Sequence, residues 1–404
     1  MPDASRHDAI TAKTRWQSGR LVAIALIGIT SSAAIAITNP TDAKSVSMVV
    51  DAAAARYVRE NPQAAAIAIG VVYGEASYQS RSGTLEPGKR RPPRHDTLYP
   101  VASITKTFTG TLLAQAVIEK RLSLSDDIRK HLDGDFPNLE FAGRPILMSD
   151  LLDHRSGLPF FLPDKPELQP DFQGDPRPHA ARVNEAMKTY GRDQFFADLH
   201  KLTLTAVPGS HYRYSNAAAQ LAGYILEKLY GQSYEQLLRN KILVPLQMNS
   251  TTITLDRAAR NRLAPGWDDK GRLAILPEGA EAAGGMKSTT GDMLKYVRWQ
   301  VDETDPAVKL SHQRVWTADD PVYGGHGTFG IGLNWQVAEL LGRRVIFQDG
   351  MIEGYSALVV IEPESKLGIV LMTNQLDQKS AAAERTLMKE LLTRLDSRAV
   401  PLPE

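Results

Sequence analysis

The chain has 404 residues, of which 43% are hydrophobic and 23% charged, so it can bury a large core and is not an intrinsically disordered protein. Its formal net charge of +1 argues against a nucleic-acid partner. It has no cysteine, which excludes disulfides, a thiol nucleophile and a lipid-modified cysteine, and its nine histidines show no spacing typical of a metal site.

The first feature along the chain is an uncharged, mostly apolar stretch at residues 21–37, which follows a basic region and ends in Ala34-Ile35-Ala36. This combination is typical of a secretory signal cleaved after Ala36. The alternative is an uncleaved anchor in the inner membrane, although the stretch is slightly short against the roughly 20 residues of a membrane span. The sequence therefore predicts an exported protein, periplasmic or extracellular, with residues 1–40 as signal peptide or anchor.

The next segments predict a helix and a hairpin. Residues 45–60 are alanine-rich and helical in pattern, whereas residues 67–73 and 76–81 predict two strands joined by a turn at Gly74-Glu75. Ile104, Phe108, Leu112 and the apolar residues after them recur every three or four positions, which predicts a helix from Ser103 to about Glu119.

That helix begins with Ser103-Ile104-Thr105-Lys106, and Ser103 is the only serine of the chain with a lysine three residues later. Residues three apart on a helix share one face, so the lysine can take the proton of the serine and make it a nucleophile. The helix N-terminus also favours a developing oxyanion. Because S-x-x-K occurs by chance about once in a chain of this length, an exposed Ser and Lys on an amphipathic helix is the alternative.

From residue 122 to about 255 the apolar spacing is mainly helical, apart from a proline-rich loop at residues 158–178. A loop of this length either walls a substrate site or is an insertion without a role, and both remain open. Later in this region stands Tyr214-Ser215-Asn216, directly before an alanine-rich helix at residues 217–230 that Gly231 closes. Beside a lysine cation the phenolate of Tyr214 becomes accessible, so the tyrosine can accept or donate a proton. The alternative is an asparagine that caps the helix beside a packed tyrosine.

The last third of the chain predicts strands again, at residues 331–337, 343–348, 356–361 and 366–372, followed by an amphipathic helix at 381–395. Their short connections imply an antiparallel meander. Residues 325–330 match G-x-G-x-x-G, but a strand pattern follows them in place of a helix, so a loop is predicted there and not a dinucleotide site.

These motifs together resemble the serine β-lactamase and penicillin-binding superfamily, in the branch of class C β-lactamases, D-alanyl-D-alanine peptidases and family VIII carboxylesterases. The resemblance also covers Leu151-Leu152-Asp153-His154-Arg155-Ser156-Gly157-Leu158-Pro159, Pro208-Gly209 and Ala283-Gly284-Gly285-Met286-Lys287-Ser288-Thr289. It runs from about residue 65 to the last helix, with the motifs in the expected order. His154 and His326 are then structural residues, because a histidine triad would leave Lys106 and Tyr214 unexplained.

The resemblance implies a role for each site residue. Ser103 is the acylated nucleophile, Lys106 its proton acceptor, Tyr214 the general base and acid, and Asn216 a residue that orients the substrate. The family's K-T-G or H-x-G motif is matched by Gln348-Asp349-Gly350. Gly350 fits, whereas Gln348 places a neutral amide where a cation is usual, a loss for which Arg343 or Arg344 can compensate from the same strand. The backbone N–H groups of Ser103 and, by position, Met351 form the oxyanion hole.

The resemblance also implies an α+β fold, with an antiparallel sheet flanked by helices and a mainly helical second lobe. Residues 41–130 and 275–398 form the catalytic lobe with the sheet, residues 131–274 form the helical lobe, and the active site lies between them. The function expected is that of an exported serine hydrolase, without metal or cofactor, acting on small esters or on D-amino-acid esters and peptides of the cell envelope. The alternatives are a class C-like β-lactamase and a penicillin-recognising sensor that is acylated but turns over poorly.

Overall fold

The fold is built on an antiparallel sheet whose strands come from the beginning and the end of the chain. The computed structural model describes residues 43–61, 66–168, 182–183, 185–187, 189–268, 271, 273–274, 280–318, 327–340 and 343–395. In these ranges the large sheet has eight strands in the order β2-β1-β12-β11-β10-β9-β8-β7. Their bounds are β1 Ala66–Tyr73, β2 Ala76–Gly83, β7 Trp316–Ala318, β8 Gly327–Ile331, β9 Gln336–Leu340, β10 Arg343–Ile352, β11 Tyr355–Glu362 and β12 Leu367–Thr373.

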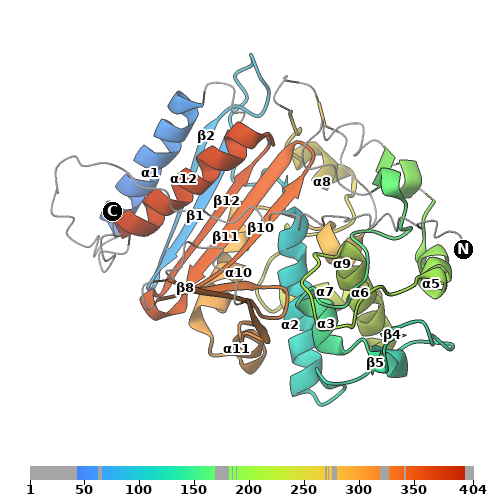
Figure 1. Cartoon of the computed structure of the whole chain (residues 1–404). Helices are drawn as coiled ribbons and strands as arrows, with labels where there is room; N and C mark the ends of the chain where they lie inside the picture. Colours follow the sequence, from blue (N-terminus) through green and yellow to red (C-terminus); the bar gives the residue numbers. More distant parts are fainter. Residues whose placement is uncertain are drawn as a thin grey trace, which may run out of the picture.

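Both faces of the sheet are covered, and the side chains of the central strands alternate between two hydrophobic cores. On β1, Ile67, Ile69 and Val71 face the core under α1 (Ala43–Glu60) and α12 (Gln378–Leu395), which lie next to each other. Ala68 and Val72 face the larger core, where α10 (Thr290–Asp302) packs on β1 and β12 (Figure 1). Because both faces are buried, β1 is apolar along its whole length.

The other elements come mainly from the middle of the chain, and Figure 1 shows them gathered to one side of the sheet. The helices are α2 Thr105–Ile118, α3 Met148–Leu152, α5 Arg192–Lys201, α6 Asn216–Tyr230, α7 Tyr234–Leu238, α8 Arg257–Arg262, α9 Glu281–Gly284 and α11 Pro306–Ser311. The short helical turns are η1 Ala102–Ile104, η2 Ile128–His131, η3 Pro166–Leu168, η4 Arg239–Leu243 and η5 Pro363–Ser365. Two small strand pairs join β3 Tyr99–Pro100 to β6 Lys287–Ser288 and β4 Glu140–Phe141 to β5 Arg144–Pro145.

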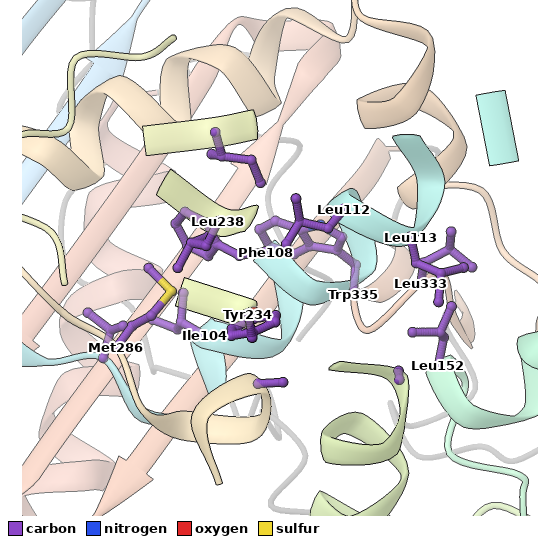
Figure 2. Packing of buried hydrophobic residues seen from close by; sticks show 14 of the residues in the cluster. Ile104, Phe108, Leu112, Leu113, Leu152, Tyr234, Leu238, Met286, Leu333 and Trp335 are labelled. Atoms are coloured by element: carbon purple, nitrogen blue, oxygen red, sulfur yellow. The ribbon is translucent and has the colours of Figure 1, made fainter. Parts of the chain in front are cut away.

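Helix α2 is buried on all sides from Thr105 to Ala114, which the sequence pattern did not predict. Apolar side chains from α3, α7 and the β8–β9 turn surround it, as Figure 2 shows for Phe108, Leu112 and their neighbours. The ring of Phe108 stacks on Tyr296 of α10, with the ring centroids 3.7 Å apart. The threonines of α2 are buried as well, and Thr107 and Thr111 donate to carbonyl oxygens of the preceding turn. The helix that follows the nucleophile is therefore a rigid core element.

The α+β prediction, with an antiparallel sheet flanked by helices, is confirmed, and two local predictions are wrong. Residues 331–337 form no continuous strand, because the chain reverses between β8 and β9 at a turn in which Asn334 has a left-handed backbone with φ of +62°. Residues 327–330, predicted as loop, belong to β8. The signal segment, residues 169–178 of the proline-rich loop and His326 lie outside the described residues. The boundaries of the two lobes stay a prediction.

Candidate active site

Ser103 occupies η1, directly before α2, and its side chain is half-buried. Ala102, the residue before it, has a left-handed backbone with φ of +45°, a conformation that costs energy in a residue with a Cβ atom. This turn places Ser103 where the chain enters the helix, and the N–H groups of Ile104 and Thr105 that follow it donate to the carbonyls of Val101 and Ala102. The nucleophile is thus presented from a strained corner on a buried helix.

Lys106 lies one turn further along and is fully buried. Its Nζ donates to three oxygens: Ser103 Oγ at 2.9 Å, Asn216 Oδ1 at 2.7 Å and Ala283 O at 2.5 Å. Two of these are carbonyl oxygens, which only accept hydrogen bonds. When Lys106 loses a proton, the two remaining N–H groups stay on these carbonyls and the lone pair faces Ser103. Burial lowers the pKa of Lys106 to about 7, so this neutral base is accessible near neutral pH.

Tyr214 is the second side chain that contacts the hydroxyl of Ser103. Its hydroxyl donates to Ser103 Oγ at 2.7 Å, and Lys106 Nζ lies 4.9 Å from the centre of its ring. Burial raises the pKa of Tyr214 above its ordinary value, which favours the neutral phenol in this state of the site. Tyr214 can then donate a proton and neutral Lys106 can accept one, and the role of the phenolate stays a prediction.

Asn216 is brought to this cluster by α6. Ser215 caps that helix through a hydrogen bond from Ala218 N to its Oγ, so the capping residue is Ser215 and not Asn216. Asn216 is then free to accept from Lys106, and its backbone N–H donates to Phe160 O at 2.9 Å. The structure thus gives Asn216 a contact with the catalytic lysine.

The Gln348-Asp349-Gly350 motif lies on β10, whose pairing with β9 stops at Phe347, so the rest of the strand leaves this edge to η1. A Cβ atom on Gly350 would lie 2.2 Å from Val101 O, so only glycine allows this close approach. Gln348 is buried, and its amide donates to the backbone carbonyl of Asp349 at 3.1 Å. Met351 follows, with 39% of its surface exposed. Its role in an oxyanion hole stays a prediction.

Neither Arg343 nor Arg344 replaces the cation that is missing at Gln348, as the sequence analysis had allowed. Arg343 pairs with Glu362, and Arg344 pairs with Glu303 and Glu364. Both arginines stand at the far end of β10, five or four residues before Gln348, and a strand rises by about 3.4 Å per residue. Gln348 therefore gains no cation from either of them.

Sequence reasoning missed two contributions to the site. Ala283 O accepts a hydrogen bond from Lys106, a contact that the Ala283-Gly284-Gly285 motif did not reveal. Asp349 faces a cavity of about 60 Å³ between the sheet and α12, shared with Glu384 and Arg385, and its charge favours the protonated form of Lys106. Side chains alternate between the two faces of a strand, so the sequence of β10 could have indicated that Asp349 points to the face opposite to that of Gln348. In the ranges that the structure describes, no group of three or more acidic or histidine side chains is placed to hold a metal ion.

Comparisons with known proteins agree with this geometry. A family model described as Beta-lactamase matches residues 54–393. A β-lactamase of Escherichia coli K12 is 25% identical over an alignment of 347 residues that covers 76% of this chain and 84% of that protein. Protein flp of Staphylococcus aureus MRSA252 is 24% identical over 287 residues, 69% of this chain and 53% of the relative, so the chain spans about half the length of flp. The crystal structure of a β-lactamase/D-alanine carboxypeptidase from Yersinia pestis complexed with citrate shares the fold, with a TM-score of 0.71 at 23% identity over 87% of this chain and 100% of that one.

Proposed function

The chain belongs to the β-lactamase family, and on that premise we propose that it is a serine hydrolase that works through an acyl-enzyme on Ser103. The observation that carries this proposal is the hydroxyl of Ser103, held between the amine of Lys106 at 2.9 Å and the phenol of Tyr214 at 2.7 Å. One partner has a pKa near neutrality and the other is protonated, so a base and an acid flank the same nucleophile.

Acylation follows from these positions. Neutral Lys106 takes the proton of Ser103 as Oγ attacks the carbonyl carbon of the substrate, and the negative charge that develops on the carbonyl oxygen faces the backbone N–H of Ser103 and, by position, that of Met351. The bond to the leaving group then breaks, and the departing oxygen or nitrogen takes the proton of Tyr214. The proton on Lys106 can return to the phenolate, because both groups meet at Ser103 Oγ. In deacylation a water molecule attacks the acyl carbon and gives its proton to neutral Lys106, the bond from that carbon to Ser103 Oγ breaks, and Oγ takes the proton of Tyr214, which Lys106 then replaces.

The substrates that fit best are small uncharged esters, or D-amino-acid esters and peptides of the cell envelope. The neutral Gln348 offers no cation to a substrate carboxylate, and the nearby half-buried carboxyl group of Asp349 adds no attraction for an anion. Export by the segment at residues 21–37 belongs to this proposal, since an envelope substrate requires it.

A second candidate function is β-lactam hydrolysis, which the similarity to the E. coli β-lactamase over 84% of that protein favours. The two candidates share the acyl-enzyme and differ in which acyl group is released quickly. A sensor would share the acylation step but not the release.

Intact mass measured over time with nitrophenyl butyrate and, separately, with a penicillin tests the proposal. We expect a short-lived butyryl adduct that maps to Ser103, steady release of nitrophenol, and no adduct on Ser103→Ala. Label at another serine, or none with either compound, would show that Ser103 is not the nucleophile. Rapid penicillin turnover would favour the β-lactamase, and a lasting penicilloyl adduct with no ester turnover would favour the sensor.

A further inference from the structure

His154 contacts the chain on both sides of Tyr214. It lies in the turn after α3, with a left-handed backbone at φ of +60°. Its backbone carbonyl accepts from Arg213 N at 2.7 Å, and its ring Nδ1 accepts from Ser215 N at 3.3 Å. These two N–H groups belong to the residues immediately before and after Tyr214. The imidazole also lies against the phenol ring, with the centroids 4.3 Å apart.

Neighbouring hydrogen bonds also fix the chain on both sides of Tyr214. Gly209 N donates to Arg155 O at 2.7 Å, and Arg155 Nη1 donates back to Gly209 O at 2.9 Å. Further along, Ser215 Oγ donates to Pro159 O at 2.6 Å. The segment that begins at His154 therefore forms a fixed template for the chain that carries Tyr214. Within it His154 and Phe160 both lie against the Tyr214 ring, and His154 is the closer, with ring centroids 4.3 Å apart against 5.8 Å for Phe160.

We propose that His154 is a positioning residue for the proton donor: its carbonyl and its Nδ1 hold residues 213 and 215 so that the Tyr214 hydroxyl stays on Ser103 Oγ. This inference rests on the proposed function, because it assumes that Tyr214 protonates the leaving group. It concerns an orienting contact and gives His154 no proton transfer of its own.

The chemistry of the position suits a histidine. Burial and the charge of Lys106 lower the pKa of His154 to about 3, so its ring is neutral and Nδ1 keeps the lone pair that Ser215 N–H needs. A phenylalanine would keep a ring but leave that buried N–H without an acceptor. An asparagine would keep an acceptor close to the place of Nδ1, and asparagine tolerates a left-handed backbone better than most residues.

Two esters with the same acyl group test the inference. Nitrophenolate leaves as a stable anion, whereas an alkoxide needs a proton as it leaves, so loss of a positioned acid slows ethyl butyrate more than nitrophenyl butyrate. We expect His154→Phe to lower kcat/KM about 100-fold for the ethyl ester and less than about fivefold for the nitrophenyl ester. The ratio of the two values does not depend on the folded fraction, so partial misfolding of a variant does not affect it.

Four further variants complete the experiment. Tyr214→Phe should show the same selective loss, and adding His154→Phe to it should change the ethyl ester rate less than about twofold, because the group being positioned is gone. His154→Asn should restore the wild-type ratio to within about threefold. His312→Phe is the matched control, since His312 is also buried and burial lowers its pKa, but it pairs with Glu303 away from Tyr214, and it should leave the ratio unchanged.

The outcomes separate the two claims. If Tyr214→Phe slows both esters equally, Tyr214 is not the leaving-group acid and the mechanism in the proposed function is wrong. If Tyr214→Phe is selective but His154→Phe slows both esters equally, or if His154→Asn behaves like His154→Phe, the positioning role is wrong while the mechanism stands.

Discussion

At the scale of single residues, the state of Lys106 decides when the site works. Its two carbonyl partners retain their hydrogen bonds in either protonation state, so only the proton that faces Ser103 is exchanged. In neutral Lys106 the lone pair therefore points to Ser103, and burial sets the pH at which this neutral form becomes available.

The first prediction is a rise of kcat/KM with pH through about 7. Below this pH Lys106 is protonated and cannot accept the proton of Ser103, and above it the neutral amine is present, since its pKa is lowered to about 7. Asp349 favours the ammonium form, so Asp349→Asn should move this limb to lower pH. Initial rates with nitrophenyl butyrate between pH 5.5 and 9 measure both effects. A profile that is flat over this range would contradict the role of Lys106.

The second prediction concerns substrate charge and Gln348. A hydrogen bond to a charged group contributes roughly 1.5–3 kcal/mol against about 1 for a neutral pair. The missing cation therefore lowers selection for anionic substrates by roughly one to two orders of magnitude, at about 1.4 kcal/mol per tenfold. Gln348→Lys should raise kcat/KM for penicillins more than for nitrophenyl butyrate, and Gln348→Met controls for the change of shape. Efficient penicillin turnover by the wild type, or equal gains on both substrates, would overturn this expectation.

At the scale of elements, the site depends on how closely β10 approaches η1. The strand brings Gly350 within van der Waals contact of the turn that holds Ser103, and this contact requires the absence of a side chain. The same approach sets the distance between Ser103 and the backbone of Met351, on which the predicted oxyanion hole depends.

The third prediction is therefore that Gly350→Ala separates β10 from η1. The added methyl group would lie 2.2 Å from Val101 O, so the strand must move and the oxyanion donors with it. We expect kcat to fall about 100-fold, with a destabilisation of roughly 1–3 kcal/mol. Gly291→Ala in α10 is the control, because its methyl group meets only ordinary contacts at 3.5 Å or more. Steady-state kinetics and a thermal melt compare the two variants. Full activity of Gly350→Ala would show that the close approach of β10 to η1 is not required.

At the scale of the whole molecule, the sequence predicted the sheet, its antiparallel order and the residues that meet at Ser103, because these depend on local patterns and on motifs in a known order. It did not predict the protonation of Tyr214, which depends on burial that only the packed structure defines. It also missed the reversal at Asn334, where a turn without proline lies inside an apolar run. The hydrogen bonds of His154 to residues 213 and 215 join segments about sixty residues apart, and no local sequence pattern predicts them.

The fourth prediction is that the mature protein begins near Ile37. This expectation rests on the segment at residues 21–37, which has the features of a cleaved signal. N-terminal sequencing of protein made in a native-like host checks this. A terminus at Met1 or Pro2 in the membrane fraction would show that the segment is an anchor.

The groups that meet at Ser103 are far apart in the sequence, and this has a consequence for the chain before it folds. Tyr214 lies 111 residues from Ser103 in sequence, and Ala283 lies 177 residues from Lys106. An unfolded or half-synthesised chain therefore carries an ordinary alcohol at Ser103, inert toward any ester it meets. On the proposed mechanism Ser103 becomes reactive only when the last of these segments docks, so we expect a label on Ser103 to report folding as directly as it reports catalysis.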